Sequence, residues 1–298
     1  MSKATRIRQQ NARERIAAQR EAARRREIRN RVLIVSCSVI AVAAIIAALF
    51  IIKANNNGSS SSGSSSPTGT ALPASVSNEI TGVPQTALDS AGIGSVVSYN
   101  NSINASPIYS VSGSALTSGG KPEMLYIGAE FCPYCAAERW GMAIALSRFG
   151  TFTTPLHGTH SSSTDVDANT PTLTFYKATY SSKYLTFTPV ENEDRNHNLL
   201  QTPTKAQQAL WNKYNPDSYP FIDFGNKYVI KGPSYNPQTL SGLSWAQVAS
   251  QLKDPSSKVA QGALGSANLI TAAICKMTGG QPGNVCTSSG VVAASAHL

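Results

Sequence analysis

The feature that most constrains this chain is a pair of cysteines, Cys132 and Cys135, set between a short apolar run and a helical pattern. Residues 124–128 predict a buried strand, and residues 133–149 predict a helix. Cys132 therefore falls at a helix start, where unpaired backbone N–H groups and the helix dipole favour a thiolate. Pro133 suits the first helical position, since its missing N–H would have no partner there. We expect Cys132 to attack a disulfide and Cys135 to resolve the mixed disulfide.

The same spacing also fits half of a zinc site, a copper-binding pair or a structural disulfide. The remaining cysteines are Cys37, Cys275 and Cys286, and they complete no zinc spacing with the pair. We favour redox chemistry, for which no metal and no cofactor is expected. Two alternatives stay open: a copper chaperone that adds His157 or His160 to the thiolates, and a non-catalytic interaction module with a structural disulfide.

The residues around the pair resemble the thioredoxin superfamily. Its members carry Ala-Glu-Trp-Cys after an apolar strand, and this chain has Ala129, Glu130, Phe131 and Cys132. The dipeptide between the cysteines, Pro133 and Tyr134, is similar to that of glutaredoxins, and DsbA-type proteins also begin it with proline. The longer run resembles a family of membrane-anchored bacterial thioredoxin-like (DsbA-like) proteins. The resemblance implies a thioredoxin-like α/β fold: a mixed central sheet flanked by helices.

A cis-proline beside the cysteines is a second implication of this resemblance. Pro220 precedes a predicted hairpin of residues 221–224 and 228–230, joined by a Gly-Asn turn. Pro171 is the rival, but it leaves no room for a parallel crossover strand before the hairpin. We therefore place the cis-proline at Pro220, where it would shape the strand that binds a client.

The proton acceptor for Cys135 is not evident from the sequence. Thioredoxin has a buried Asp six residues before the first cysteine, whereas this chain has Tyr126. Glu130 or Glu138 could accept the proton, but each is more readily read as a solvated carboxylate of a loop or helix.

The N-terminus predicts a membrane anchor. Residues 1–31 carry eleven Lys and Arg against three Glu, and residues 32–52 hold no charge. A run of 21 uncharged residues is long enough to cross a ~30 Å hydrocarbon core. The positive tail predicts a cytosolic N-terminus and an extracytoplasmic body, residues 77–298, at the cell membrane. Residues 53–76, rich in Ser and Gly, predict a flexible linker.

The charge of the chain is concentrated in that tail. The whole chain has 25 basic and 16 acidic residues; subtracting the tail leaves fourteen basic and thirteen acidic residues. The body is thus almost neutral, and no nucleic-acid partner is implied. The expected partners are the thiols or disulfides of exported proteins, and a redox partner in the membrane.

The remaining cysteine pair, Cys275 and Cys286, lies near the C-terminus with ten residues between. In an exported compartment these two are expected to form a structural disulfide; a relay of electrons to the first pair is the alternative. Further strands are predicted at 172–177 and 184–189. Further helices are predicted at 204–214, within an insertion of residues 192–217, and at 244–252 and 267–277. The hypothesis is a membrane-tethered thiol-disulfide oxidoreductase with the active site Cys132, Cys135 and Pro220.

Overall fold

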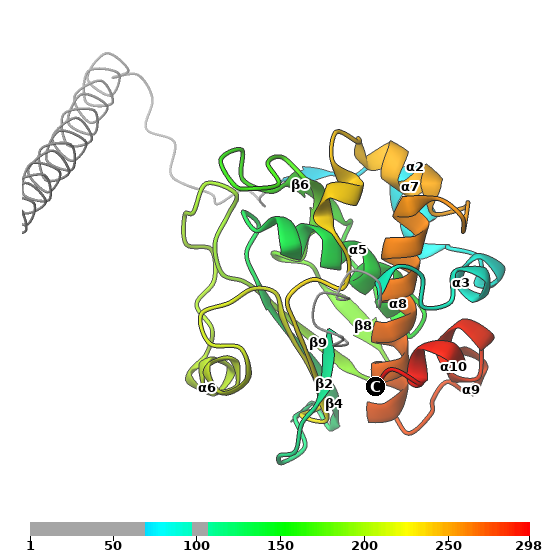
Figure 1. The fold of residues 1–298 in the computed structure, drawn as a ribbon. Helices are drawn as coiled ribbons and strands as arrows, with labels where there is room; N and C mark the ends of the chain where they lie inside the picture. Colours follow the sequence, from blue (N-terminus) through cyan, green and yellow to red (C-terminus); the bar gives the residue numbers. More distant parts are fainter. Residues whose placement is uncertain (1–68, 97–106) are drawn as a thin grey trace, which may run out of the picture. The chain divides into compact units, whose positions relative to one another are not determined.

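The computed structural model describes residues 69–96 and 107–298, which form a mixed α/β body (Figure 1). Eleven strands belong to the described residues: β1 (Thr70–Ala71), β2 (Ile108–Ser110), β3 (Thr117–Ser118), β4 (Lys121–Gly128), β5 (Gly150–Phe152), β6 (His157–His160), β7 (Pro171–Thr174), β8 (Tyr180–Ser182), β9 (Thr186–Glu191), β10 (Phe221–Phe224) and β11 (Tyr228–Lys231). The helices are α2 (Ala74–Thr81), α3 (Gln85–Ala91), α5 (Pro133–Ser147), α6 (Lys205–Tyr214), α7 (Trp245–Gln251), α8 (Lys258–Met277), α9 (Gly283–Cys286) and α10 (Ser289–Ser295), with a 3₁₀ turn at Pro237–Leu240.

The central sheet has β4 at its middle. The strand order is β2-β11-β10-β4-β3, and β9 also pairs with β4. The β4–β9 pair is parallel, whereas β10 runs antiparallel to both β4 and β11. The sheet is therefore mixed, as the sequence predicted. A second sheet of β1-β6-β7 and the β5–β8 ribbon complete the strands of the described body.

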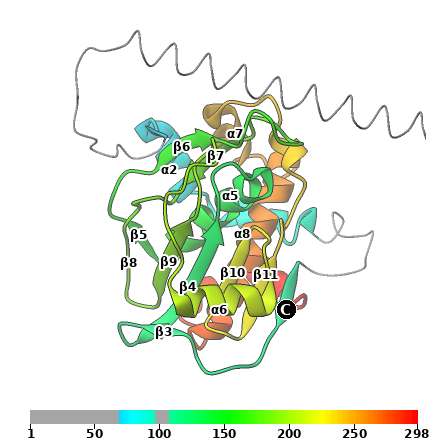
Figure 2. The ribbon, with the colours of Figure 1, turned by 90° about the vertical axis from the view of Figure 1, so that its left-hand side faces the viewer.

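The two faces of the sheet are covered by different helices. Alternate residues of a strand point to opposite faces, so Met124 and Tyr126 pack with α5 and α8, while Leu125 and Ile127 pack with Trp211 of α6. Figure 2 shows α6 in front of the sheet and α8 behind it. Helix α6 lies between β9 and β10 in the chain, within the predicted insertion. Thr204 and Gln207 form a capping box at its start.

Helix α8 is longer than the sequence suggested. It spans Lys258–Met277, whereas residues 267–277 were predicted. Gly262 and Gly265 weaken the helical pattern, yet both are packing positions: a Cβ on Gly262 would collide with the ring of Tyr235, and one on Gly265 with the carbonyl oxygen of Ile93. The small residues let neighbouring segments approach the helix closely, which offsets their low helical propensity.

The predicted linker of residues 53–76 extends too far. Within it, Thr70 and Ala71 pair with β6, and α2 begins at Ala74. Leu72 and Val76 are buried in the core. These two apolar side chains, set among Ser, Pro and Ala, suffice to fold the last part of the segment onto the body.

The predicted basic tail and membrane span, residues 1–31 and 32–52, lie outside the described residues. Among residues 69–96 and 107–298, no helix combines the length and the apolar character that crossing a membrane would require.

Candidate active site

Cys132 caps the helix that follows it. It is the N-cap of α5, Pro133 is the first helical residue, and the sulfur of Cys132 accepts a hydrogen bond from the backbone N–H of Cys135 at 3.3 Å. Both cysteines are free thiols. Cys132 is 5% exposed and Cys135 is fully buried, so of the two only Cys132 reaches the surface. The arrangement gives the pair one outward and one inward sulfur.

The surroundings shift the pKa values of the two thiols in opposite directions. The hydrogen bond from the Cys135 thiol, the backbone N–H of Cys135 and the charge of Arg139 lower the pKa of Cys132, although burial opposes them. The backbone N–H of Tyr134 acts in the same direction. Burial raises the pKa of Cys135 well above its usual range. The surroundings thus favour the thiolate form of Cys132 and the protonated form of Cys135.

Pro220 lies next to the cysteine-bearing turn. The Tyr219–Pro220 bond is cis, as the resemblance implied. Pro220 precedes β10, whose Phe221 is paired with Ile127 of β4, so the proline lies at the end of β4 from which the turn departs. The bond before Pro171, the rival, is trans. The carbonyl oxygen of Pro171 instead accepts a hydrogen bond from the Trp140 indole at 3.0 Å, which holds β7 against α5.

Phe131 belongs to an aromatic row beside the pair. Its ring stacks on His197 with centroids 4.0 Å apart and meets Tyr219 edge-on at 6.0 Å. Tyr219 in turn stacks on Trp211 of α6 at 5.0 Å. The hydroxyl of Tyr219 donates to Asn192 at 2.6 Å. The insertion therefore contacts Phe131, the residue directly before Cys132, through rings that the sequence pattern did not bring together.

Two loops fix the backbone on either side of Phe131. The N–H of Glu130 donates to the carbonyl oxygen of Glu193 at 2.8 Å, and the carbonyl oxygen of Phe131 accepts from the N–H of Ser162 at 2.8 Å. The loops are linked in turn, because Arg195 donates to the side chain of Asn169 at 2.9 Å. The segment before Cys132 is thus held from both sides.

The expectation that Glu130 and Glu138 are solvated is wrong, because both are fully buried. Glu130 accepts a hydrogen bond from the hydroxyl of Thr174 at 2.5 Å. Glu138 accepts from the N–H and the hydroxyl of Ser234, each at 2.8 Å, and from the hydroxyl of Ser266 at 3.2 Å. Burial raises the pKa of Glu138 to about 7. These three hydrogen bonds from two residues join α5, which carries Glu138, to α8 and to the loop at Ser234.

Sequence reasoning missed the strongest charged pair near the cysteines. Arg139 and Glu191 are both fully buried and form a bidentate ion pair, with Nε–Oε1 at 2.9 Å and Nη2–Oε2 at 2.7 Å. A signal was present: Arg139, with Glu138 before it, interrupts a largely apolar helix four residues after Cys135. A buried charge requires a partner, and Glu191 at the end of β9 supplies it because β9 runs parallel to β4.

The histidines of the copper hypothesis are not gathered with the thiols. His157 and His160 lie at the two ends of β6, where His160 contacts Trp245. In the part of the chain that the structure describes, no three His, Cys, Asp or Glu residues form a group that could hold a metal ion. A copper site there would have only the two thiols.

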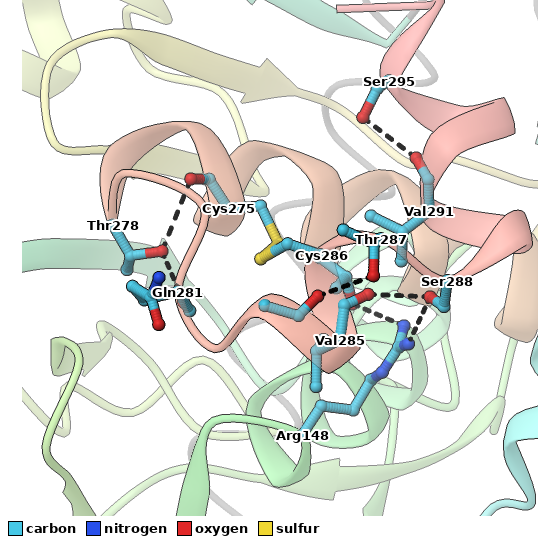
Figure 3. The surroundings of a disulfide bond; sticks show 12 residues. Arg148, Cys275, Thr278, Gln281, Val285, Cys286, Thr287, Ser288, Val291 and Ser295 are labelled. Carbon is cyan, nitrogen blue, oxygen red and sulfur yellow. Dashed lines mark hydrogen bonds between the residues drawn. A yellow bond between two sulfur atoms is a disulfide. The ribbon is translucent and has the colours of Figure 1, made fainter.

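The second cysteine pair lies at the other end of α5. Cys275 and Cys286 form the predicted disulfide, with Cα atoms 5.6 Å apart. Figure 3 shows Arg148, which directly follows α5; its guanidinium donates to the hydroxyl of Ser288, two residues after Cys286, at 3.0 Å. Because α5 has 15 residues, its length of ~22 Å separates the two pairs. Direct exchange between them, the alternative role of the second pair, would need a large rearrangement.

A family model described as "Domain of unknown function (DUF929)" matches residues 107–276 of the chain. The match covers the cysteine pair, Pro220 and the strands of the central sheet. No curated protein and no solved structure matches the chain.

Proposed function

The chain belongs to this family of unknown function, so we propose its activity from the site alone: it is a thiol-disulfide oxidoreductase on a thioredoxin-like fold. The observation that carries the proposal is the state of Cys132, a free N-cap cysteine whose sulfur accepts a backbone N–H and whose neighbour Cys135 is held beneath the surface. These are the conditions under which a thiolate attacks a disulfide and a second thiol resolves the product.

The arrangement of strands supports the thioredoxin-like part of the proposal. The cysteines follow β4, the parallel partner of β9, and the cis-proline precedes β10, the antiparallel partner of β4. Cys132 and Pro220 thereby lie at the same end of the neighbouring strands β4 and β10, although 88 positions separate them in the chain. Such a juxtaposition gives a client backbone a place to lie beside the attacking sulfur.

The reaction needs only the protein's own groups and a client. The Cys132 thiolate attacks a client disulfide, forms a mixed disulfide and releases one client thiolate. Cys135 then loses its proton and attacks Cys132, which releases the second client thiolate and leaves a Cys132–Cys135 disulfide. The reverse sequence oxidises a client dithiol. We propose that the clients are exported proteins and that residues 32–52 tether the body to the membrane, so that the chemistry takes place outside the cytoplasm.

Trapping of the mixed disulfide tests this mechanism. With Cys135→Ser in the full chain, attack by Cys132 can begin but cannot be resolved, so a peptide with one disulfide should remain covalently bound at Cys132. Cys132→Ser is the matched control and should trap none. Equal trapping by both variants, or by neither, would reject the proposed roles.

A further inference from the structure

The buried charge near the Cys132–Cys135 pair is a cation, Arg139, and not a single carboxylate. Arg139 lies four residues after Cys135 and seven after Cys132 on the same helix, spacings that put all three on one helical face. Its side chain is fully buried. Because an arginine side chain does not lose its proton in proteins, this charge is permanent.

The guanidinium is fixed relative to the cysteine-bearing turn. Besides its two bonds to Glu191, Arg139 donates from Nη2 to the carbonyl oxygen of Ala129 at 2.8 Å. The same oxygen accepts the backbone N–H of Cys132 at 3.2 Å. The carbonyl oxygen of Ala129 thus bonds both Arg139 and Cys132. The fold therefore fixes the guanidinium relative to the Cys132 residue.

Two buried donors at this place are left without acceptors. Among the described residues, neither Nη1 of Arg139 nor the hydroxyl of Tyr126 has a hydrogen-bond partner, and both atoms are buried. The guanidinium carbon lies 5.9 Å from the centre of the Tyr126 ring. A Cβ on Gly128 would collide with the Tyr126 hydroxyl, so this hydroxyl points along β4 toward the turn that carries Cys132.

Glu191 pairs with Arg139 and offsets part of the effect of its charge on the sulfurs. Both oxygens of Glu191 are occupied by the guanidinium, and Oε1 also accepts the N–H of Phe175 at 3.1 Å. Glu130 is held by Thr174. Arg139 lowers the pKa of both Cys132 and Cys135. Stabilising a thiolate stabilises the reduced pair, because the disulfide carries no charge to stabilise.

We propose that Arg139 sets the direction of electron flow at this site: the buried cation favours the reduced pair, so the protein oxidises client dithiols. The inference rests on the proposed function. A client thiolate attacks Cys132 of the disulfide, and Cys135 leaves and takes up a proton. The second client thiolate then attacks the client sulfur, and Cys132 leaves as the thiolate that Arg139 stabilises. Two electrons pass from the client to the pair. Arg139 is a positioning residue, since it acts on the sulfurs without reacting.

The test is the equilibrium of the full chain with glutathione, measured for the Cys132–Cys135 pair by differential alkylation and mass spectrometry. Arg139→Met alone would leave Glu191 buried and unpaired, so the informative variant is the double change Arg139→Met with Glu191→Gln. We expect the equilibrium constant to move about tenfold or more toward the disulfide, equivalent to about 30 mV. The pKa of Cys132, followed by the rate of alkylation against pH, should rise in the same variant.

Three variants serve as controls. Arg139→Lys keeps the charge and should stay closer to the wild-type equilibrium than the double variant does. Arg148→Met removes the arginine at the other end of α5 and should change neither the equilibrium nor the pKa. Glu130→Gln tests the carboxylate nearest in sequence to the pair.

The outcomes distinguish the inference from the proposed function. A folded double variant with an unchanged equilibrium and an unchanged pKa would overturn the role of Arg139, as would a larger shift from Glu130→Gln. If the wild-type pair fails to exchange with glutathione at all, the proposed function itself fails.

Discussion

The cysteine pairs near the two ends of helix α5 are in opposite states. At its N-terminus, Cys132 and Cys135 are free, and backbone N–H groups and a buried arginine act on their sulfurs. Near its C-terminus, Cys275 and Cys286 are bonded and join the end of α8 to α9. The difference teaches that the surroundings of a sulfur decide its state: a helix start and a nearby buried cation favour a thiolate, whereas a cross-link between two segments removes both thiols.

The largest expected effect is on the rate of thiol-disulfide exchange, which should depend on the Cys132–Cys135 pair and not on the Cys275–Cys286 pair. Cys132→Ser should lower the rate of thiol-disulfide exchange by about 10³-fold or more, because it removes the attacking group. The double change Cys275→Ser and Cys286→Ser should leave the rate within about twofold. Both rates can be measured with a fluorescent disulfide peptide. Loss of exchange in the second variant, with the fold retained, would show that the pairs work together.

For stability, in contrast to the exchange rate, the Cys275–Cys286 pair should matter more than the Cys132–Cys135 pair. Removing the Cys275–Cys286 bond opens a loop with a sequence separation of 11, which should cost about 2–3 kcal/mol in the free energy of unfolding. Changing both Cys132 and Cys135 to Ser should cost less, since no cross-link is lost. Urea unfolding of the wild type and the two double variants under non-reducing conditions measures both values; equal losses would contradict the comparison.

Arg148 allows a sharper comparison along α5. It donates to Asn268, Thr271, Gln85 and Ser288, and burial lowers its pKa to about 10. Arg148→Met should cost about 1–3 kcal/mol in unfolding free energy, because buried acceptors lose their donor. The exchange rate should not change. A slower rate at unchanged fold would mean that the far end of the helix does influence the cysteines.

A pH dependence of the stability is expected at the middle of α5. The pKa of Glu138 is raised from 4.5 to about 7, so the folded state binds its proton more tightly than the unfolded state. The stabilisation is therefore complete below about pH 4.5 and is lost as the pH rises through about 7. Glu138→Gln should flatten this part of the stability profile.

Asp223 has a pKa raised to about 6 and adds a slope of the same sign, so Asp223→Asn is the comparison variant. Thermal unfolding from pH 4 to pH 8 measures both profiles. A Glu138→Gln profile as steep as that of the wild type would place the effect elsewhere.

Local signals were enough to predict the elements around the site. The helix from Pro133, the hairpin after Pro220 and the helix of residues 205–214 follow from capping residues, turn residues and periodicity. The mixed α/β class followed from the alternation of those elements.

The contacts between distant segments could not be predicted in this way. Arg139 meets Glu191, and Phe131 meets His197, only because β9 lies beside β4 and the insertion folds back over the turn. Glu138 was misread for the same reason, since its partners Ser234 and Ser266 lie on segments far away in sequence. Burial of a polar group depends on tertiary partners, which periodicity does not reveal.

The most direct test of the account is a redox titration of the full chain against glutathione, in which mass spectrometry reads each cysteine separately. The account predicts that Cys132 and Cys135 change together between thiol and disulfide, while Cys275 and Cys286 stay bonded across the same range. A Cys132–Cys135 pair that does not titrate, or a Cys275–Cys286 bond that is reduced first, would contradict it.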